Sequence, residues 1–359
     1  MLKSEIIRWL REEDGGRLEE LWRLADETRR ANVGDEVHLR GLVEFSNHCA
    51  RRCAYCGLNV GNESLVRYRM TLDAIVGCAR KAVEFGYGTV VLQSGEDYGA
   101  TAEWMAAVVR RIKNETPLAV TLSLGERSDD DLRLWREAGA DRYLLRFETS
   151  NPRLFERTHP SLPGRRSDRI AILRALRRLG YETGSGVMIG IPGQTYEDLA
   201  DDILLFRGLD LDMIGVGPFI PHPSTPLGQR RNPQSAIRNS QSPQSFPPTP
   251  AGQQAPNDEL MTYKVVALSR LVCPRANIPS TTALATLNLA GGRELALRRG
   301  ANVVMPNLTP PEYRTLYEIY PAKACLRETA EQCHVCLKQR IEAIGRRTGE
   351  GRGDARTIR

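Results

Sequence analysis

The sequence predicts an α/β fold: a TIM-type barrel of eight βα units with an N-terminal helical cap and a C-terminal extension. From residue 37 onward, short β-branched and apolar runs alternate with longer amphipathic stretches, the pattern of parallel strands joined by helical crossovers. The chain has 359 residues, of which 41% are hydrophobic and 26% charged. Such barrels commonly occupy about 250 residues, so this length allows one barrel with additions at both ends.

The elements follow in order along the chain. Residues 1–36 are charged, with apolar residues at helical spacing, and predict a helical cap. The predicted strands are 37–45, 89–93, 118–122, 142–147, 186–191, 213–216, 278–282 and 302–305. The predicted helices between them are 72–85, 102–112, 129–138, 169–179, 196–206 and 260–272. In a parallel barrel the active site lies on the loops that follow the strands, so functional residues are expected there.

Two segments interrupt this pattern. Residues 228–258 are rich in Pro, Gln, Ser and Asn, and they hold too little apolar surface to offset the entropy of ordering. We therefore expect a disordered insertion without a catalytic role within the barrel domain, residues 37–310. Residues 311–359 form the C-terminal extension, whose Arg- and Gly-rich tail from Gly345 is expected to be flexible.

Charge and composition narrow the classes of partner. Fifty Lys and Arg against 44 Asp and Glu give a net charge of +6 with no strongly basic patch, so no nucleic-acid partner is expected. No stretch of about 18 apolar residues occurs, and the first residues mix acids and bases, so we expect a cytoplasmic protein with no membrane partner. No long coiled-coil pattern is present, and we expect a monomer.

Six of the eight cysteines form two tight trios, which indicates metal binding in a reducing compartment. The first trio, Cys49, Cys53 and Cys56, directly follows the first predicted strand, so its thiolates should converge at the barrel mouth. Three thiolates on a 4Fe-4S cluster leave one iron open to a small chelating ligand. A zinc ion held by the three thiolates and His48 is the alternative, although His48 adjoins Cys49 and joint coordination is awkward.

With Tyr55 before its last cysteine, this CxxxCxxC segment resembles the radical S-adenosylmethionine (SAM) superfamily. The resemblance implies that the open iron chelates the amino and carboxylate groups of SAM. One electron from the cluster then yields methionine and a 5′-deoxyadenosyl radical. Implied partners are an electron donor such as ferredoxin or flavodoxin and, within the barrel, the substrate.

Residues after later strands match SAM-binding positions of that superfamily. The segment 93–97, Gln-Ser-Gly-Glu-Asp, is a variant of the superfamily's Gly-Gly-Glu and is implied to contact the SAM amino group. Arg146 and Glu148 have opposite charges that suit a zwitterion, and a structural ion pair is their alternative role. The implied SAM-binding residues are Gln93, Ser94, Thr121, Ser123, Glu148 and Arg169.

Further segments, among them residues 43–49, 93–97 and 304–307, resemble the FeFe-hydrogenase maturase family HydE over about residues 20–346. This family helps to build the dithiomethylamine bridge of the hydrogenase diiron subcluster. The implied substrate is a small organometallic complex of iron with cysteine, carbonyls and cyanide, delivered by another hydrogenase maturase. The implied anion and substrate cavity is lined by Arg40, Arg142, Arg146, Thr281, Thr282, Tyr317 and Tyr320. No side chain is assigned as a catalytic residue.

The second trio, Cys325, Cys333 and Cys336, resembles an auxiliary iron–sulfur site of some HydE proteins, and a zinc knuckle using His334 is the alternative. Methylornithine synthase and biotin synthase share the barrel and the first cysteine spacing, and would act on a different substrate such as an amino acid. A non-catalytic iron–sulfur scaffold is a third reading. The SAM-binding segments argue against the scaffold, and the second trio favours the maturase family.

Overall fold

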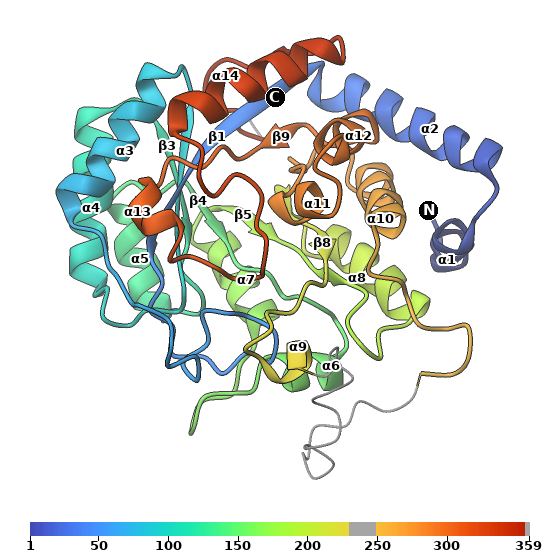
Figure 1. Cartoon of the computed structure of the whole chain (residues 1–359), viewed down its shortest axis with the longest axis horizontal. Helices are drawn as coiled ribbons and strands as arrows, with labels where there is room; N and C mark the ends of the chain where they lie inside the picture. The colour runs from blue at the N-terminus through green and yellow to red at the C-terminus, as the bar shows by residue number, and fades with distance from the viewer. Residues whose placement is uncertain (230–248, 356–359) are drawn as a thin grey trace.

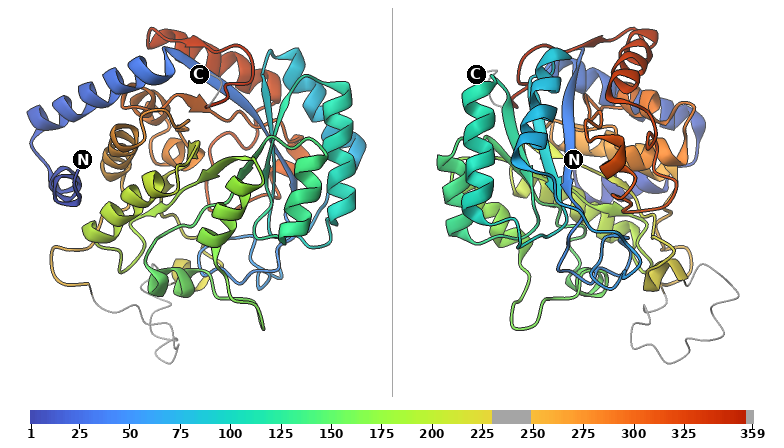
Figure 2. Two further views of the ribbon diagram at one scale, coloured as in Figure 1. Left: turned by 180° about the vertical axis from the view of Figure 1, so that it is seen from behind. Right: turned by 60° about the vertical axis from the view of Figure 1, so that its left-hand side comes forward.

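The computed structural model describes residues 1–229 and 249–355. Parallel strands curl into a barrel that is flanked by helices (Figures 1 and 2). The N-terminal helices α1 (Lys3–Arg11) and α2 (Gly15–Val33) pack against helices of the second half of the chain, α8 and α10. Ile6 and Leu21 are fully buried in these contacts, as helical spacing predicts.

The barrel sheet follows the order β10-β1-β2-β3-β4-β5-β7, and its pairings are parallel. Single bridges join Met213 to Asn277 and Pro279 to Val303, so residues 277–279 connect β7 to β9, which pairs with β1. The ring is thereby closed. The strands are β1 (Glu36–Ser46), β2 (Thr89–Ser94), β3 (Ala119–Ser123), β4 (Arg142–Leu144), β5 (Glu182–Ser185), β7 (Met213–Ile214), β9 (Val303–Val304) and β10 (Arg347–Thr348).

Each crossover helix begins at a side chain that caps it. Thr, Ser or Asp at the N-cap accepts a hydrogen bond from a backbone N–H of the first turn. These caps fix where the loops of the barrel mouth end. The crossover helices are α3 (Leu72–Glu84), α4 (Ala102–Glu115), α5 (Asp129–Glu137), α7 (Arg169–Arg178), α8 (Tyr196–Gly208) and α10 (Glu259–Val272).

The predicted fold class is confirmed, but two predicted strands are wrong. The fifth strand is β5, which ends before the predicted range 186–191. The apolar run after it forms β6 (Met188–Ile189), which pairs with β8 (Gly217–Pro218) and packs with Phe219 and Ala54 beneath the cysteine loop. The predicted strand 278–282 is reduced to single bridges, because the Thr281 side chain caps helix α11 (Thr282–Leu287).

The two segments expected to be flexible differ from that expectation where they are described. Residues 230–248 of the predicted insertion lie outside the described residues, while Ala255 donates its N–H to the Gln194 carbonyl at 2.9 Å. The tail packs against the barrel as far as Ala355, the last described residue. Arg352 pairs there with Asp141, and Asp354 pairs with Arg142. The remaining helices are α6 (Pro152–Thr158), α9 (Pro226–Gln229), α12 (Gly292–Arg298), α13 (Pro311–Arg314) and α14 (Ala330–Ala343).

None of the helices in the described ranges is both long enough and apolar enough to cross a membrane.

Candidate active site at the barrel mouth

The first cysteine trio lies on the loop after β1, and the loop after β2 packs directly against it. The Glu96 N–H points to the Cys49 sulfur at 3.4 Å. A Cβ at Gly95 would lie 2.8 Å from the Cys49 Cβ and would also clash with the His48 carbonyl. Only glycine therefore fits at this position. The contact explains why a small residue stands in the segment that sequence analysis assigned to SAM.

The three thiols form a donor set that fits a cluster. Burial raises the pKa of Cys53 well above its usual range, and the nearby Cys56 and Cys49 add to this shift. Burial also raises the pKa of Cys56 to about 12. The three thiols would thus ionise together only with a cationic centre among them. Within the described parts of the chain, no group of three His, Cys, Asp or Glu residues is arranged for a single metal ion. A 4Fe-4S cluster binds each thiolate through a different iron.

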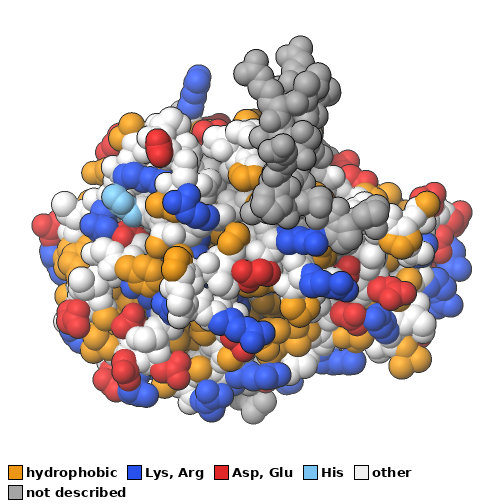
Figure 3. Space-filling model, turned by 90° about the horizontal axis from the view of Figure 1, so that it is seen from below, with side chains coloured by type: hydrophobic (Ala, Val, Ile, Leu, Met, Phe, Trp, Pro, Cys, Tyr) orange, Lys and Arg blue, Asp and Glu red, His pale blue; other side chains and the backbone are white. Residues whose placement is uncertain are grey.

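The barrel encloses a cavity of about 320 Å³ behind this mouth. Figure 3 looks toward this end of the barrel, where the surface is hollowed and hydrophobic side chains lie between charged ones. Arg169 and Glu148 connect the cavity to the thiols, since they contribute to the pKa shifts of Cys53 and Cys56. The predicted site residues that line the cavity are Gln93, Ser94, Thr121, Ser123, Glu148, Arg169, Arg40, Arg146, Thr281, Thr282 and Tyr320.

The cavity wall offers both charges and a free hydroxyl. Arg146 Nη2 lies 3.0 Å from Glu148 Oε2, and both residues line the cavity. The two side chains therefore form an ion pair and are also available to a ligand. Glu148 has φ of 64°, the left-handed region, and burial raises the pKa of its carboxyl. No hydrogen-bond partner for the buried Thr121 hydroxyl is found among the described residues. An amino-acid group of a ligand would satisfy these side chains.

A buried ion-pair network fixes the cysteine loop, and sequence analysis missed it. Arg51 lies between Cys49 and Cys53, and its guanidinium is 2.7 Å from both Glu96 and Glu126. Glu126 also lies 2.9 Å from Arg169. The network joins the loops after β1, β2 and β3 to the start of α7. The only signal in the sequence was the presence of acids after two successive strands, which does not reveal their partner.

Two predicted arginines lie deeper than the mouth. Arg142 is fully buried at the base of the barrel, where it contacts Glu182 at 2.5 Å and Asp354, and it does not line the cavity. The reason is its place at the start of β4, since inward side chains there face the barrel base. Arg40 lines the cavity and donates to the Gly353 carbonyl at 3.0 Å. Tyr317 is buried and does not line the cavity, but its hydroxyl accepts a hydrogen bond at 3.2 Å from Gln93, which does.

The second trio lines its own cavity of about 220 Å³ together with Arg293 and Arg340. His334 instead stacks on Phe85 and hydrogen-bonds to the Tyr87 hydroxyl at 3.0 Å, so nothing here supports the zinc knuckle. Lys323, which sequence analysis missed, lines both this cavity and the barrel cavity and pairs with buried Glu44. The two cavities therefore adjoin.

Asp202 of α8 holds two mouth loops and supplies a prediction about pH. It accepts hydrogen bonds from Ser150 N at 2.5 Å and Gln194 Nε2 at 3.3 Å, and burial raises its pKa to about 7. The folded protein therefore binds an extra proton between about pH 4 and 7, and this contribution to stability falls as the pH rises through that window. We expect Asp202→Asn to flatten the pH dependence of unfolding, by about 1.4 kcal/mol for each unit of pKa shift.

Denaturant unfolding at pH 5 and pH 8 tests this expectation. The matched control is Asp201→Asn, because Asp201 is the exposed neighbour and pairs with Lys3 at the surface. Equal pH slopes for wild type and Asp202→Asn would contradict the assignment.

Known proteins are similar to this chain in sequence and in fold. The Radical SAM superfamily model matches residues 43–206. The chain is 46% identical over 345 residues to the [FeFe] hydrogenase maturase subunit HydE of Thermotoga maritima, covering 96% of this chain and 91% of that protein. It is 29% identical over 293 residues to 3-methylornithine synthase of Methanosarcina acetivorans, covering 80% of this chain and 74% of that protein. The crystal structure of methylornithine synthase (PylB) has the same fold, with a TM-score of 0.78, 24% identity, and coverage of 97% and 94%.

The matched segment contains the first cysteine trio and the ends of β2, β3 and β4 that line the cavity. Identity to the maturase is well above identity to the synthase and extends over almost the full length of both chains. The chain therefore belongs to the radical SAM superfamily and, within it, to the [FeFe] hydrogenase maturase family HydE, and it is a radical SAM enzyme.

Proposed function

We propose that the enzyme binds a 4Fe-4S cluster through Cys49, Cys53 and Cys56 and acts on a small sulfur-bearing iron complex during assembly of the hydrogenase diiron subcluster. When bound, the cluster supplies the electron that cleaves SAM to methionine and a 5′-deoxyadenosyl radical. The observation that carries the proposal is the position of the trio at the barrel mouth, where Cys53 and Cys56 lie close enough to Arg169 and Glu148 of the cavity wall to interact with their charges.

The wall nearest the trio supports SAM binding. Arg169 and Arg146 offer guanidinium groups to the SAM carboxylate, and Glu148 offers a carboxylate to its amino group. Thr121 offers its unpartnered hydroxyl, and Gln93, Ser94 and Ser123 add further polar groups to the same wall. These contacts would orient the ligand between the barrel walls, where each interaction is stronger than in solution.

The remaining wall suits an anionic substrate. Arg40, Thr281, Thr282, Tyr320 and Lys323 supply positive charge and hydroxyl groups. Cyanide and carboxylate groups of an iron complex with cysteine would accept hydrogen bonds from these donors. A sulfur-containing amino acid is the second candidate, since its carboxylate would use the same groups.

The second trio supports an auxiliary iron–sulfur cluster held by Cys325, Cys333 and Cys336. Arg293 and Arg340 line the same cavity and would offset the negative charge of the thiolates. We expect this cluster to be peripheral to the reaction. The expected protein partners of the enzyme are other hydrogenase maturases and an electron donor such as ferredoxin or flavodoxin.

Anaerobic reconstitution tests the proposal. With SAM and dithionite, the reconstituted protein should release 5′-deoxyadenosine, and with the other maturases it should activate a hydrogenase in a SAM-dependent manner. A scaffold would support activation without cleaving SAM. SAM cleavage without any support of hydrogenase activation would contradict the proposed substrate while leaving the radical chemistry intact.

A further inference from the structure

The C-terminal tail crosses the base of the barrel, the end opposite the cysteine loop. After β10 pairs with the start of β1, the carbonyl of Arg352 accepts hydrogen bonds from Thr89 Oγ1 and Arg142 Nη2, each at 2.9 Å. The next carbonyl, of Gly353, accepts from Arg40 Nη2 and Asn277 Nδ2, each at 3.0 Å. Groups on β1, β2, β4 and the 277–279 segment thus all bind one short stretch of tail backbone.

The tail also supplies the charge that the base lacks. Arg40 and Arg142 are buried next to each other, and burial together with Arg142 lowers the pKa of Arg40 to about 9. Asp354 pairs with Arg142 and lies 3.1 Å from Arg352, which in turn pairs with Asp141. Glu182 of the barrel wall supplies one negative charge for these two buried arginines, and Asp354 of the tail supplies a second, which matters because unbalanced buried charge is strongly destabilising.

The fit between tail and barrel is too close for larger side chains. A Cβ at Gly88 would clash with the Gly351 carbonyl, and a Cβ at Gly353, whose φ is 60°, would lie 2.7 Å from the His38 ring. The glycines that suggested a frayed tail in the sequence instead allow it to seat closely.

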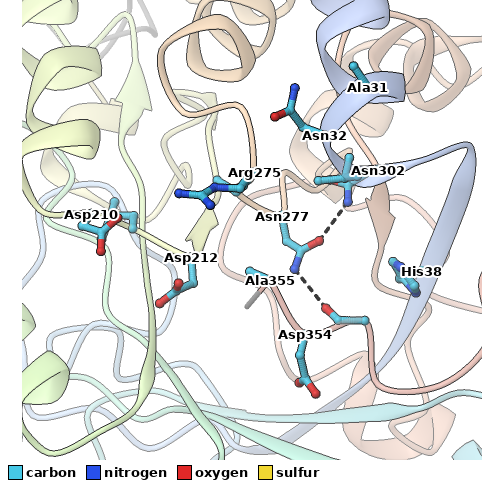
Figure 4. A pocket seen from close by; sticks show the side chains of 14 residues that line it. Ala31, Asn32, His38, Asp210, Asp212, Arg275, Asn277, Asn302, Asp354 and Ala355 are labelled. Atoms are coloured by element: carbon cyan, nitrogen blue, oxygen red, sulfur yellow. Dashed lines mark hydrogen bonds between the residues drawn. The ribbon is translucent and has the colours of Figure 1, made fainter. Parts of the chain in front are cut away.

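The tail contacts separate two cavities. Arg40 and Asn277 line the barrel cavity of about 320 Å³, called the reaction cavity from here on. Asn277 also lines a basal pocket of about 210 Å³, whose other lining residues include His38, Asp354 and Ala355. Figure 4 shows this basal pocket, with Asn277 hydrogen-bonded both to Asn302 and to the tail. The contacts of Gly353 with Arg40 and Asn277 therefore form a partition between the reaction cavity and the basal pocket.

We propose that residues 349–355 form a plug that closes the base of the reaction cavity. Asp354 is the positioning residue for Arg142, and the Gly353 carbonyl holds Arg40. A radical enzyme requires such closure on the side away from its cofactors, because small solutes that enter would intercept the reactive intermediate. This inference uses the family's radical chemistry and is independent of the substrate proposed above.

Arginine modification in the cluster-free protein tests whether this plug closes the base of the cavity, without any activity measurement. The test protein ends after Glu350, and the matched control ends after Ala355, so the control loses only residues outside the described ranges. After phenylglyoxal treatment, mass spectrometry measures the modification rates of Arg40 and Arg142. We expect both to rise about ten-fold or more in the shorter protein and to be unchanged in the control. Equal rates in the two proteins would overturn the proposal.

A second variant separates the charge of Asp354 from the folding of the tail. Asp354→Asn keeps the size of the side chain, and it carries the test if the shorter protein fails to fold by circular dichroism. We expect faster modification of Arg142 and a lower melting temperature, because a buried guanidinium loses a carboxylate partner. Acetate should slow the modification, because it replaces the lost carboxylate. Unchanged reactivity of Arg142 in Asp354→Asn, or no protection by acetate, would overturn the role of Asp354.

Discussion

Substitution of Cys53 by alanine is expected to remove the cluster and to reduce SAM cleavage to less than about one thousandth of wild type. Cys53 is the buried member of the trio, and its loss would leave two of the three thiolate ligands. Changes outside the ligand shell typically cost about 10–100-fold, and loss of a ligand itself costs more. The measurements are iron content, the electron paramagnetic resonance signal of the reduced cluster, and 5′-deoxyadenosine formed under anaerobic conditions.

Cys78→Ala is the matched control for this experiment. Cys78 is also buried, but it lies within α3 and belongs to neither trio, and burial raises the pKa of its thiol to about 12. The control should keep its iron and its SAM cleavage. Retention of a SAM-responsive cluster in Cys53→Ala would remove the basis for the assigned ligand set.

Glu126→Gln is expected to produce the largest loss of stability, about 3–5 kcal/mol in the free energy of unfolding. Glu126 is 1% exposed, and its carboxylate neutralises part of the charge of both Arg51 and Arg169. The amide would leave Arg51 paired with Glu96, while Arg169 would keep only its longer-range attraction to Glu148. SAM cleavage should fall as well, because Arg169 loses the partner that holds it in the cavity wall. Denaturant unfolding of the cluster-free protein measures the first effect.

The same substitution at the surface provides the control. Glu27 pairs with Arg23 at 2.8 Å on α2, but both side chains are more than half exposed. Glu27→Gln should therefore change the unfolding free energy by less than about 1 kcal/mol. Similar losses for Glu126→Gln and Glu27→Gln would show that the buried network does not hold the cysteine loop.

Local signals made most of the barrel predictable. The strands β1 to β3 are β-branched runs, and the helices after them begin at Thr or Ser caps, so their positions agree with the prediction to within a few residues. β5 reads Glu-Thr-Gly-Ser and was missed, because it contains no apolar run. Its Ser185 hydroxyl is buried by donating to the Leu145 carbonyl at 2.8 Å, and polar burial of this kind leaves no hydrophobic pattern in the sequence.

The site was predictable to the extent that its chemistry is local in sequence. The spacing of Cys49, Cys53 and Cys56 pointed to their convergence, and strand ends gathered most of the predicted cavity residues. The partners of Arg51 and Arg142 were not predictable. Arg142 meets Asp354 at a separation of 212 residues, and only the closed barrel brings the two together.

The pairing of β1 with β9 and β10 has a consequence for biogenesis. One edge of β1 has its partners at residues 303–304 and 347–348, more than 250 residues further along the chain. During translation that edge stays unpaired until those residues are made, and it can pair wrongly with other chains. We therefore expect nascent chains to need chaperone protection, and chains that stop before residue 303 to aggregate.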